Sequence, residues 1–259
     1  MKNYGICQLS VVPVRKSPVS TSEMVTQIIF GEIFSIVKYE EKWSIVSNEF
    51  DNYQGWVNNS QIKFIEKKDF ELLKSNMPVY CLDNKGYIKN ANKEIISVPL
   101  GSLISSCFFL ETIYFGNTSI STKNDLIKNA KLFLNAPYLW GGRIPYGIDC
   151  SGFSQIVYKI HGIKINRDAN QQLIQGKKID INKVSNGDLA FFGDSIDSIT
   201  HVGIMLNKDE IIHAYGKVRI DKINNDGIIN SETKKITHRL IEFRSYWFSN
   251  SSILALINL

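Results

Sequence analysis

Short apolar runs separated by turn residues dominate the first 66 residues. Residues 27–30, 33–37 and 43–46 are rich in β-branched and aromatic side chains, and Gly31-Glu32 and Asp51-Asn52 interrupt the runs. Runs of this kind, bounded by turn residues at even spacing, predict short strands. Several such strands in so short a segment fit a small closed sheet. We therefore predict a first β-barrel over residues 1–66.

The same pattern continues less regularly over the next fifty residues. Apolar runs and turn residues alternate at 78–80, 85–88 and 98–102. This spacing predicts a second, degenerate barrel over residues 67–119.

Helical patterns then replace the strands. Ser121 or Thr122 can cap a helix with apolar residues at helical spacing. These apolar residues are Leu126, Ile127, Ala130, Phe133 and Leu134. A second helix is predicted from Asp149 to His161-Gly162, and a third over 167–174. Strands are predicted to return after Gly187, at 189–192, 201–206, 210–215, 237–243 and 253–259. Helices followed by sequential strands predict an α+β domain over residues 120–259, in which the helices pack on a largely antiparallel sheet.

Composition and charge exclude several classes of protein. Hydrophobic residues make up 44% and charged residues 21%, which is typical of a globular chain. The formal net charge is +5, but the basic residues form scattered pairs instead of the stripe that binds nucleic acid. No apolar run approaches the ~18 residues of a membrane span, and the chain start lacks the apolar core of a secretory signal. We expect a cytoplasmic protein, or a periplasmic or secreted one if a signal was removed.

One of the four cysteines has a distinctive context. Cys7, Cys81 and Cys107 lie in apolar, strand-like segments that indicate buried, inert thiols. Cys150 begins a predicted helix, where unpaired N–H groups and the positive end of the helix dipole favour a thiolate. No cysteine spacing suggests a zinc site, and we expect no metal and no organic cofactor.

Two histidines can supply the base that such a thiol needs. His201 and His213 lie on consecutive predicted strands, and a hairpin around residues 207–209 would bring their imidazoles together. With Cys150 on the helix that packs across this hairpin, they would form a Cys–His–His arrangement. His161 ends a helix, and His238 lies in a basic stretch that predicts a solvated side chain.

Five local motifs occur in a fixed order along the last part of the chain. They are Tyr138-Leu139-Trp140-Gly141-Gly142, Asp149-Cys150-Ser151-Gly152-Phe153, Gly187-Asp188-Leu189-Ala190-Phe191-Phe192, His201-Val202-Gly203-Ile204 and Ile212-His213-Ala214. The set resembles the NlpC-type family of papain-like cysteine peptidases, which cut bacterial cell-wall peptides, and the resemblance covers residues 122–259. Residues 14–18, 31–32 and 53–57 resemble the bacterial SH3-like domain.

The resemblance implies a role for each residue of the site. Cys150 would be the nucleophile, His201 the general base, and His213 the residue that orients His201. A second imidazole in this third position supplies no full negative charge. The backbone N–H of Cys150 and the hydroxyl of Tyr138 would stabilise the oxyanion.

Two SH3-like modules and residues 167–172 resemble the branch of this family with γ-D-glutamyl-L-diamino acid endopeptidase activity. The resemblance implies hydrolysis of the γ-D-glutamyl–diamino acid bond in murein stem peptides with a free N-terminal L-Ala, which releases L-Ala-D-Glu. Asp149 and Ser151 would bind substrate, and Asp149 can also cap the helix. Glu23 and Tyr53 would face the cleft from the first barrel.

Two other functions stay open from the sequence. The chain could be a cell-wall-binding protein with an inert papain-like domain, although Cys150, His201 and His213 are all present. It could also be an amidase or acyltransferase, since only the acceptor and the pocket would differ. The sequence does not specify the diamino acid after D-Glu, the choice between recycling and wall remodelling, or the oligomeric state.

Overall fold

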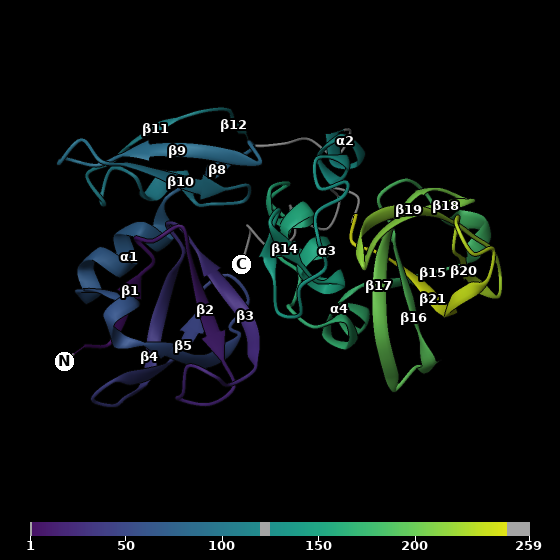
Figure 1. Cartoon of the computed structure of the whole chain (residues 1–259), viewed down its shortest axis with the longest axis horizontal. Coiled ribbons are helices and arrows are strands. Elements are labelled where there is room, and N and C mark those ends of the chain that lie inside the picture. The colour runs from purple at the N-terminus through teal and green to yellow at the C-terminus, as the bar shows by residue number, and fades with distance from the viewer. Residues whose placement is uncertain (1, 120–124, 248–259) are drawn as a thin grey trace, which may run out of the picture.

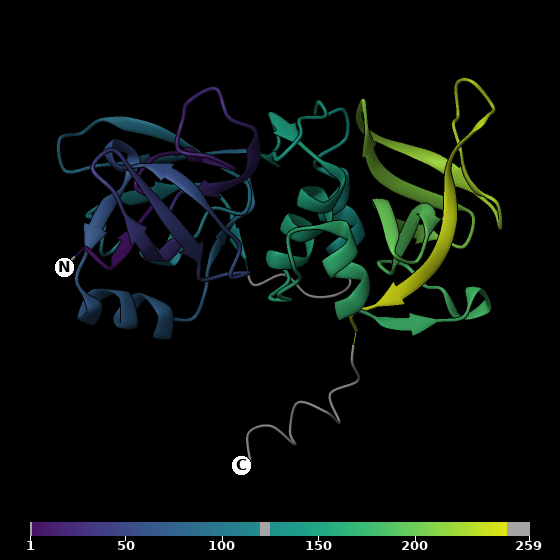
Figure 2. The same ribbon diagram turned by 90° about the horizontal axis from the view of Figure 1, so that it is seen from below.

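The computed structural model describes residues 2–119 and 125–247. Figure 1 shows two β modules at the N-terminal end, a group of helices in the middle and a large sheet at the opposite end. Figure 2 shows from a second direction that the helices lie between the N-terminal modules and this sheet. No helix among the described residues is long and apolar enough to cross a membrane.

The first module is a seven-stranded antiparallel sheet in the order β3-β2-β6-β5-β4-β1-β7. Buried and half-buried residues alternate along β5, as expected for a strand with one face in a core. That core contains Val12, Val14, Phe34, Val46 and Val57. The strands are β1 (Tyr4–Ile6), β2 (Val11–Arg15), β3 (Met24–Ile29), β4 (Ile33–Tyr39), β5 (Trp43–Asn48), β6 (Gln54–Asn58) and β7 (Lys63–Ile65).

The second module begins with a helix that the sequence pattern did not predict, α1 (Lys67–Ser75). Its buried residues Phe70 and Leu73, one turn apart, pack against Ile6 and Ile33 of the first module. Two small antiparallel sheets follow, β10-β9-β11 and β12-β8. Their strands are β8 (Tyr80–Cys81), β9 (Lys85–Lys89), β10 (Ile95–Pro99), β11 (Ile113–Phe115) and β12 (Thr118–Ser119).

Three helices and a short hairpin follow, and they carry one side of the candidate site. The helices are α2 (Leu126–Lys131), α3 (Cys150–Lys159) and α4 (Ala169–Gln175), and the hairpin is β13 (Arg143–Ile144) with β14 (Gly147–Ile148). All three helices were predicted, including the start of α3 at Cys150. The predicted caps of the first helix, Ser121 and Thr122, lie outside the described residues.

A second seven-stranded sheet completes the molecule, in the order β15-β21-β16-β17-β18-β19-β20, and a further pairing of β20 with β21 curls it round on itself. Every pairing is antiparallel, as predicted. The strands are β15 (Lys177–Ile179), β16 (Leu189–Ser195), β17 (Ser198–Asn207), β18 (Glu210–Tyr215), β19 (Lys217–Ile223), β20 (Gly227–Ile229) and β21 (Ile236–Ser245). The strand predicted at 253–259 lies outside the described residues.

The two faces of this sheet differ in their surroundings. Val202, Ile204, Ile212 and Ala214 belong to the apolar core that contains the buried residues of α3. The alternate residues point to the other face, where Phe192, Met205 and Ile211 form a separate core. The helices packed on an antiparallel sheet, behind N-terminal SH3-like strands, confirm the predicted fold class.

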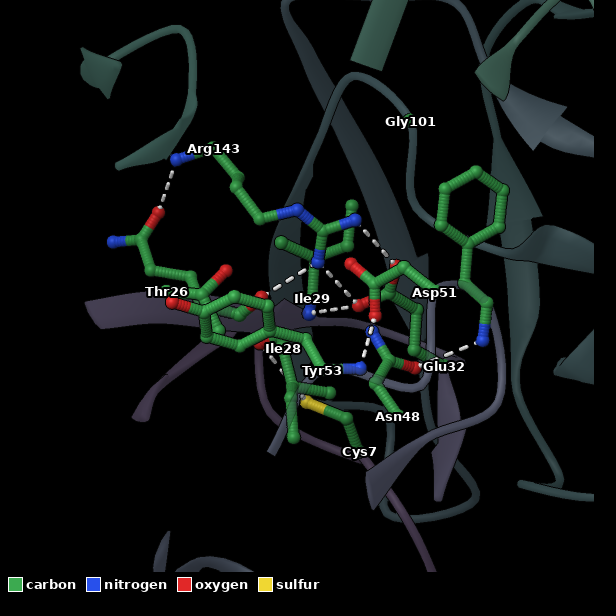
Figure 3. A network of polar contacts seen from close by, with 12 residues as sticks. Cys7, Thr26, Ile28, Ile29, Glu32, Asn48, Asp51, Tyr53, Gly101 and Arg143 are labelled. Atoms are coloured by element: carbon green, nitrogen blue, oxygen red, sulfur yellow. Dashed lines mark hydrogen bonds and ion pairs between the residues drawn. The ribbon is translucent and has the colours of Figure 1, made fainter. Parts of the chain in front are cut away.

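A buried ionic network joins the first module to the β13 hairpin and to α3, and Figure 3 shows its Glu32 and Arg143 side chains. Glu32, in the turn between β3 and β4, is 3% exposed; its Oε2 lies 2.9 Å from Arg143 Nη1 and its Oε1 lies 2.6 Å from Lys159 Nζ. Burial disfavours the charged carboxylate, but the two cations outweigh it and lower the pKa of Glu32 to about 2. One carboxylate therefore holds both the β13 hairpin and the end of α3.

Candidate active site

Cys150 begins α3 and is almost completely buried. Its sulfur lies beside the backbone N–H of Val202, the residue that follows His201. Burial, and then the negative charge of Asp149, raise the pKa of the Cys150 thiol to about 12, against the opposing effects of the Val202 N–H and Arg167. Burial therefore outweighs the helix end that we expected to favour a thiolate, and the Cys150 thiol is protonated at neutral pH.

The two predicted histidines are hydrogen-bonded to each other. Nε2 of His201 lies 2.8 Å from Nδ1 of His213. They come from β17 and β18, which pair around residues 207–210, so the predicted hairpin is confirmed. Gly203 lies opposite His213, and a Cβ at Gly203 would lie only 2.8 Å from the Cβ of His213. The glycine thus provides the space that the His213 side chain occupies.

Asp221 extends this pair, and the sequence interpretation missed it. Its Oδ2 lies 3.1 Å from Nε2 of His213, while Arg219 and the backbone N–H of Ser231 hold the carboxylate from the other side. Burial opposes ionisation, but the bonds from His213 and Ser231 lower the pKa of Asp221. The expectation that no full negative charge supports the histidines was wrong, because β19 places this carboxylate behind His213.

Both histidines of the pair are uncharged at neutral pH. Burial, followed by the competing titration of the neighbouring His213 and His238, lowers the pKa of His201 well below its usual range. Burial also lowers the pKa of His213, although Asp221 opposes the shift. A neutral imidazole has a free lone pair, so His201 can accept a proton.

The prediction that His238 has a solvated side chain was wrong, because this side chain is half-buried. Its ring stacks on the ring of His201, with 4.0 Å between the ring centroids and 24° between the planes. His201, His213 and His238 are the one group of metal-ligand type in the described residues, with ligand atoms within 4.8 Å of one another. The bond between His201 and His213 and the parallel stacking of His238 favour a proton relay over a metal centre.

Tyr138 lies in the neighbourhood of the nucleophile. Burial, and then the neighbouring acidic groups Cys150 and Asp149, raise the pKa of the Tyr138 hydroxyl to about 12. Its chain segment is fixed because its N–H donates to the carbonyl of Gly216 at 3.0 Å. Tyr138 therefore stays protonated at neutral pH and can donate a hydrogen bond.

A cavity of about 460 Å³ lies between the first module and Cys150. Its lining includes all the predicted substrate-binding residues, Glu23, Tyr53, Asp149 and Ser151, together with Cys150. Trp140, Arg167, Asp168, Asn170, Ile199 and Thr200 complete most of the wall. The structure thus brings together residues that lie more than a hundred positions apart in the chain.

Asp149 and Ser151 are already engaged within the protein. The Asp149 carboxylate forms two bonds with Arg167, at 2.6 and 3.0 Å, and accepts from the N–H groups of Gly152 and Gly141. The bond from Gly152 confirms that Asp149 caps α3. Ser151 Oγ accepts from Arg167 at 2.9 Å. The Arg167 guanidinium therefore neutralises the carboxylate of Asp149, the residue before Cys150.

Glu23 also has partners. The indole N–H of Trp140 donates to its Oε1 at 2.8 Å, and Lys16 lies 3.3 Å from its Oε2. Its side chain is 41% exposed. This contact makes Trp140 and Glu23 a bridge between the helical region and the first module.

Asp168 is the cavity carboxylate that the sequence interpretation did not assign. It caps α4 and hydrogen-bonds to the Tyr53 hydroxyl, and no basic side chain forms an ion pair with it within the described part of the chain. Burial raises the pKa of Asp168, while the charge of Arg167 opposes that shift. Among the three acidic side chains that line the cavity, Asp168 is therefore the one whose charge a bound cation would stabilise most, because Asp149 and Glu23 already have basic partners.

Comparisons with known proteins agree with this geometry. Residues 135–237 match the sequence model of the NlpC/P60 family, and residues 14–62 match that of the bacterial dipeptidyl-peptidase SH3 domain. A gamma-D-glutamyl-L-lysine dipeptidyl-peptidase of Bacillus cereus is 29% identical over 81% of this chain and 74% of its own length. The protein of that name from Bacillus subtilis is 27% identical over 73% of this chain and 71% of its own length.

A solved structure supports the same fold. The crystal structure of an NlpC/P60 family protein from Bacillus cereus has a TM-score of 0.77 to this chain, at 20% identity, and covers 94% of this chain and 99% of its own. The chain therefore carries an NlpC/P60 domain behind a bacterial dipeptidyl-peptidase SH3 domain, as the sequence motifs indicated.

Proposed function

We propose that the protein is a cysteine peptidase that hydrolyses the γ-D-glutamyl–diamino acid bond of murein stem peptides with a free N-terminal L-Ala. The observation that carries this proposal is the cavity shared by the SH3 module and the nucleophile. The names of the two Bacillus relatives support the choice of bond. The NlpC/P60 match supports peptidase chemistry at Cys150.

In this proposal, Cys150 attacks the carbonyl carbon of the γ-glutamyl bond while His201 removes the thiol proton. Because both groups are neutral at rest, the thiol proton has to pass to His201 for the sulfur to act as a nucleophile. His213 holds the new imidazolium through its hydrogen bond, and Asp221 adds a negative charge behind it. The Cys150 N–H and the Tyr138 hydroxyl donate to the oxyanion.

The attack of Cys150 gives a tetrahedral intermediate, and its collapse breaks the bond between the γ-glutamyl carbonyl carbon and the amine of the diamino acid. His201 returns its proton to the leaving amine, and the γ-glutamyl group stays on the Cys150 sulfur as a thioester. Water then attacks the thioester, and His201 accepts the proton of that water. The bond between the carbonyl carbon and the Cys150 sulfur then breaks, His201 returns its proton to the sulfur, and L-Ala-D-Glu leaves.

The SH3 side of the cavity would bind the ammonium of L-Ala. Asp149 is neutralised by Arg167, and Glu23 is paired with Lys16 in an exposed position. Asp168, oriented by the Tyr53 hydroxyl, is therefore the preferred partner. A buried ammonium needs such a carboxylate, because its desolvation is otherwise uncompensated. Glu23 and Ser151 would line the remaining wall.

The test compares hydrolysis of L-Ala-γ-D-Glu-L-Lys with that of its N-acetylated form by mass spectrometry. Wild type should cleave the free peptide at least ~100-fold faster, since acetylation removes the charge that the cavity binds. Asp168→Asn should reduce this preference, mainly through KM. Cys150→Ala should be inactive on both peptides with its fold intact, and Cys107→Ser is the matched control. Equal rates on the free and acetylated peptides would disprove the proposed amine pocket.

A further inference from the structure

His238 makes the closest ring contact to the proposed general base, yet the mechanism above does not use it. Its ring lies flat against His201, while Phe192 lies on β16 at 5.8 Å from the His201 ring with 49° between the planes. β21 and β17 are not neighbours, because β16 lies between them. The contact therefore depends on the curl that the β20–β21 pairing gives the sheet.

The surroundings of His238 fix the plane of its own ring. Its Nδ1 lies 2.9 Å from the Thr237 hydroxyl, and the Tyr215 ring meets it edge-on at 4.8 Å and 90°. Its backbone pairs with Ile228 of β20. A ring held by polar, aromatic and backbone contacts provides a rigid surface for the imidazole stacked on it.

The proposed reaction requires one orientation of His201. Nε2 must stay 2.8 Å from His213, so that the other ring nitrogen is available for the thiol proton. Rotation of the His201 ring about its bond to Cβ would break the hydrogen bond to His213. The His238 ring, which lies flat against one face of the His201 ring, leaves no room for such rotation. We propose that His238 is a positioning residue, which holds the imidazole of His201 in the plane of the His213–Asp221 relay. The inference rests on the proposed function, in which His201 is the base of Cys150.

The charge state of His238 is compatible with this role. Burial, and then the competing titration of His213, lower the pKa of His238 to about 4, while Asp221 opposes the shift. The titratable and charged groups around it are His201, His213, Asp221 and Tyr215, with Arg219 behind Asp221. At neutral pH the ring carries no charge, so it does not repel the imidazolium that forms on His201.

Alkylation of Cys150 by iodoacetamide tests the inference without any peptide substrate. We would measure its rate from pH 5 to 9 by mass spectrometry of the Cys150 peptide, in wild type, His238→Ala and His238→Phe. Arg239→Ala, at an exposed position next along β21, is the matched control. Alkylation and peptide hydrolysis should both slow roughly 10- to 100-fold in His238→Ala, with KM unchanged. His238→Phe keeps a flat ring and should recover most of both rates.

Two results would overturn the inference. One is a His238→Ala protein that is folded and reacts like wild type across the pH range. The other is His238→Phe, folded by its thermal unfolding curve, with rates as low as those of His238→Ala. If the variants alter alkylation as expected but wild type cleaves no stem peptide, the proposed substrate is wrong and the positioning role stands.

Discussion

At the scale of single residues, Asp221 changes the expected chemistry most. A relay of two imidazoles has only dipoles with which to stabilise the imidazolium that forms on His201. The Asp221 carboxylate, 3.1 Å from His213 and held by Arg219, adds a fixed negative charge at the end of the relay. It also selects the His213 tautomer, because an ionised carboxylate requires a proton on Nε2 and so leaves Nδ1 as an acceptor.

Asp221→Asn should therefore lower kcat by roughly 10- to 100-fold with little change in KM, because the amide removes the charge. His213→Asn should keep measurable activity, while His213→Ala should lose more, because the alanine leaves His201 without a partner. Steady-state kinetics on the tripeptide checks these values. Asp226→Asn, in the exposed turn before β20, is the control. An Asp221→Asn protein with the kcat of wild type would remove the carboxylate from the relay.

The residues found from the sequence and those missed differ in one physical respect. Cys150, His201 and His213 lie within local motifs, and their alternation and helix position could be read from a few neighbours. The proposed roles of Asp221 and Asp168 depend on partners that lie on other elements. The partner of Asp221 is His213, and that of Asp168 is Tyr53. His238 was misjudged because its sequence neighbours are basic, whereas its neighbours in space are aromatic rings.

At the scale of elements, the curled sheet encloses the histidine relay and keeps it neutral. β17, β18 and β21 each contribute one histidine to the same cluster. Local sequence patterns predicted most of the elements but not α1. This helix buries only Phe70 and Leu73, and two apolar positions are too few to give a helical pattern in the sequence. Their contacts with the first module stabilise the helix, and these contacts join segments that are far apart in the sequence.

The neutral histidines predict how stability depends on pH. A histidine whose pKa is lowered by folding binds more protons in the unfolded chain, so stability is lost as pH falls below about 6.5. Each such histidine contributes a slope of about 1.4 kcal/mol per pH unit between that value and its folded pKa. His201, His213 and His238 should therefore make the free energy of unfolding fall as pH drops from 6.5 to 5.

Urea unfolding at several pH values in this range measures the slope. His213→Asn should reduce the slope by the contribution of one histidine, whatever its effect on stability at pH 7. A slope in wild type near zero would show that these histidines are not held neutral.

At the scale of the whole molecule, Glu32 joins the SH3 module to the hairpin and the helix on either side of Cys150. The side chains of its two partners, Arg143 and Lys159, are 0% and 2% exposed. Neither cation can therefore be hydrated by solvent if the carboxylate is lost. Arg143 lies on the hairpin before the nucleophile, and Lys159 at the far end of α3. The network thus sets the position of α3 relative to the wall of the cavity.

Glu32→Gln should lower the free energy of unfolding by about 3–5 kcal/mol, because it leaves two buried cations without a counter-charge. Thermal and urea unfolding measure the loss. Glu66→Gln is the control, since Glu66 and its partner Lys68 are both mostly exposed and should contribute little. A Glu32→Gln protein as stable as wild type would show that the network does not fasten the two parts together.

The same network has a consequence for synthesis on the ribosome. The strands of the first module end at Ile65, but the cations that balance Glu32 are 111 and 127 residues further along the chain than Glu32. Chains are made at roughly 5–20 residues per second. For several seconds, therefore, a nascent first module has an acidic group in its β3–β4 turn with no counter-charge. That group must stay hydrated, or take up a proton, until the remainder of the chain emerges. The ion pairs of Glu32 with Arg143 and Lys159 can form only after α3 has been synthesised, so this part of the first module reaches its final packing together with the helix that begins at Cys150.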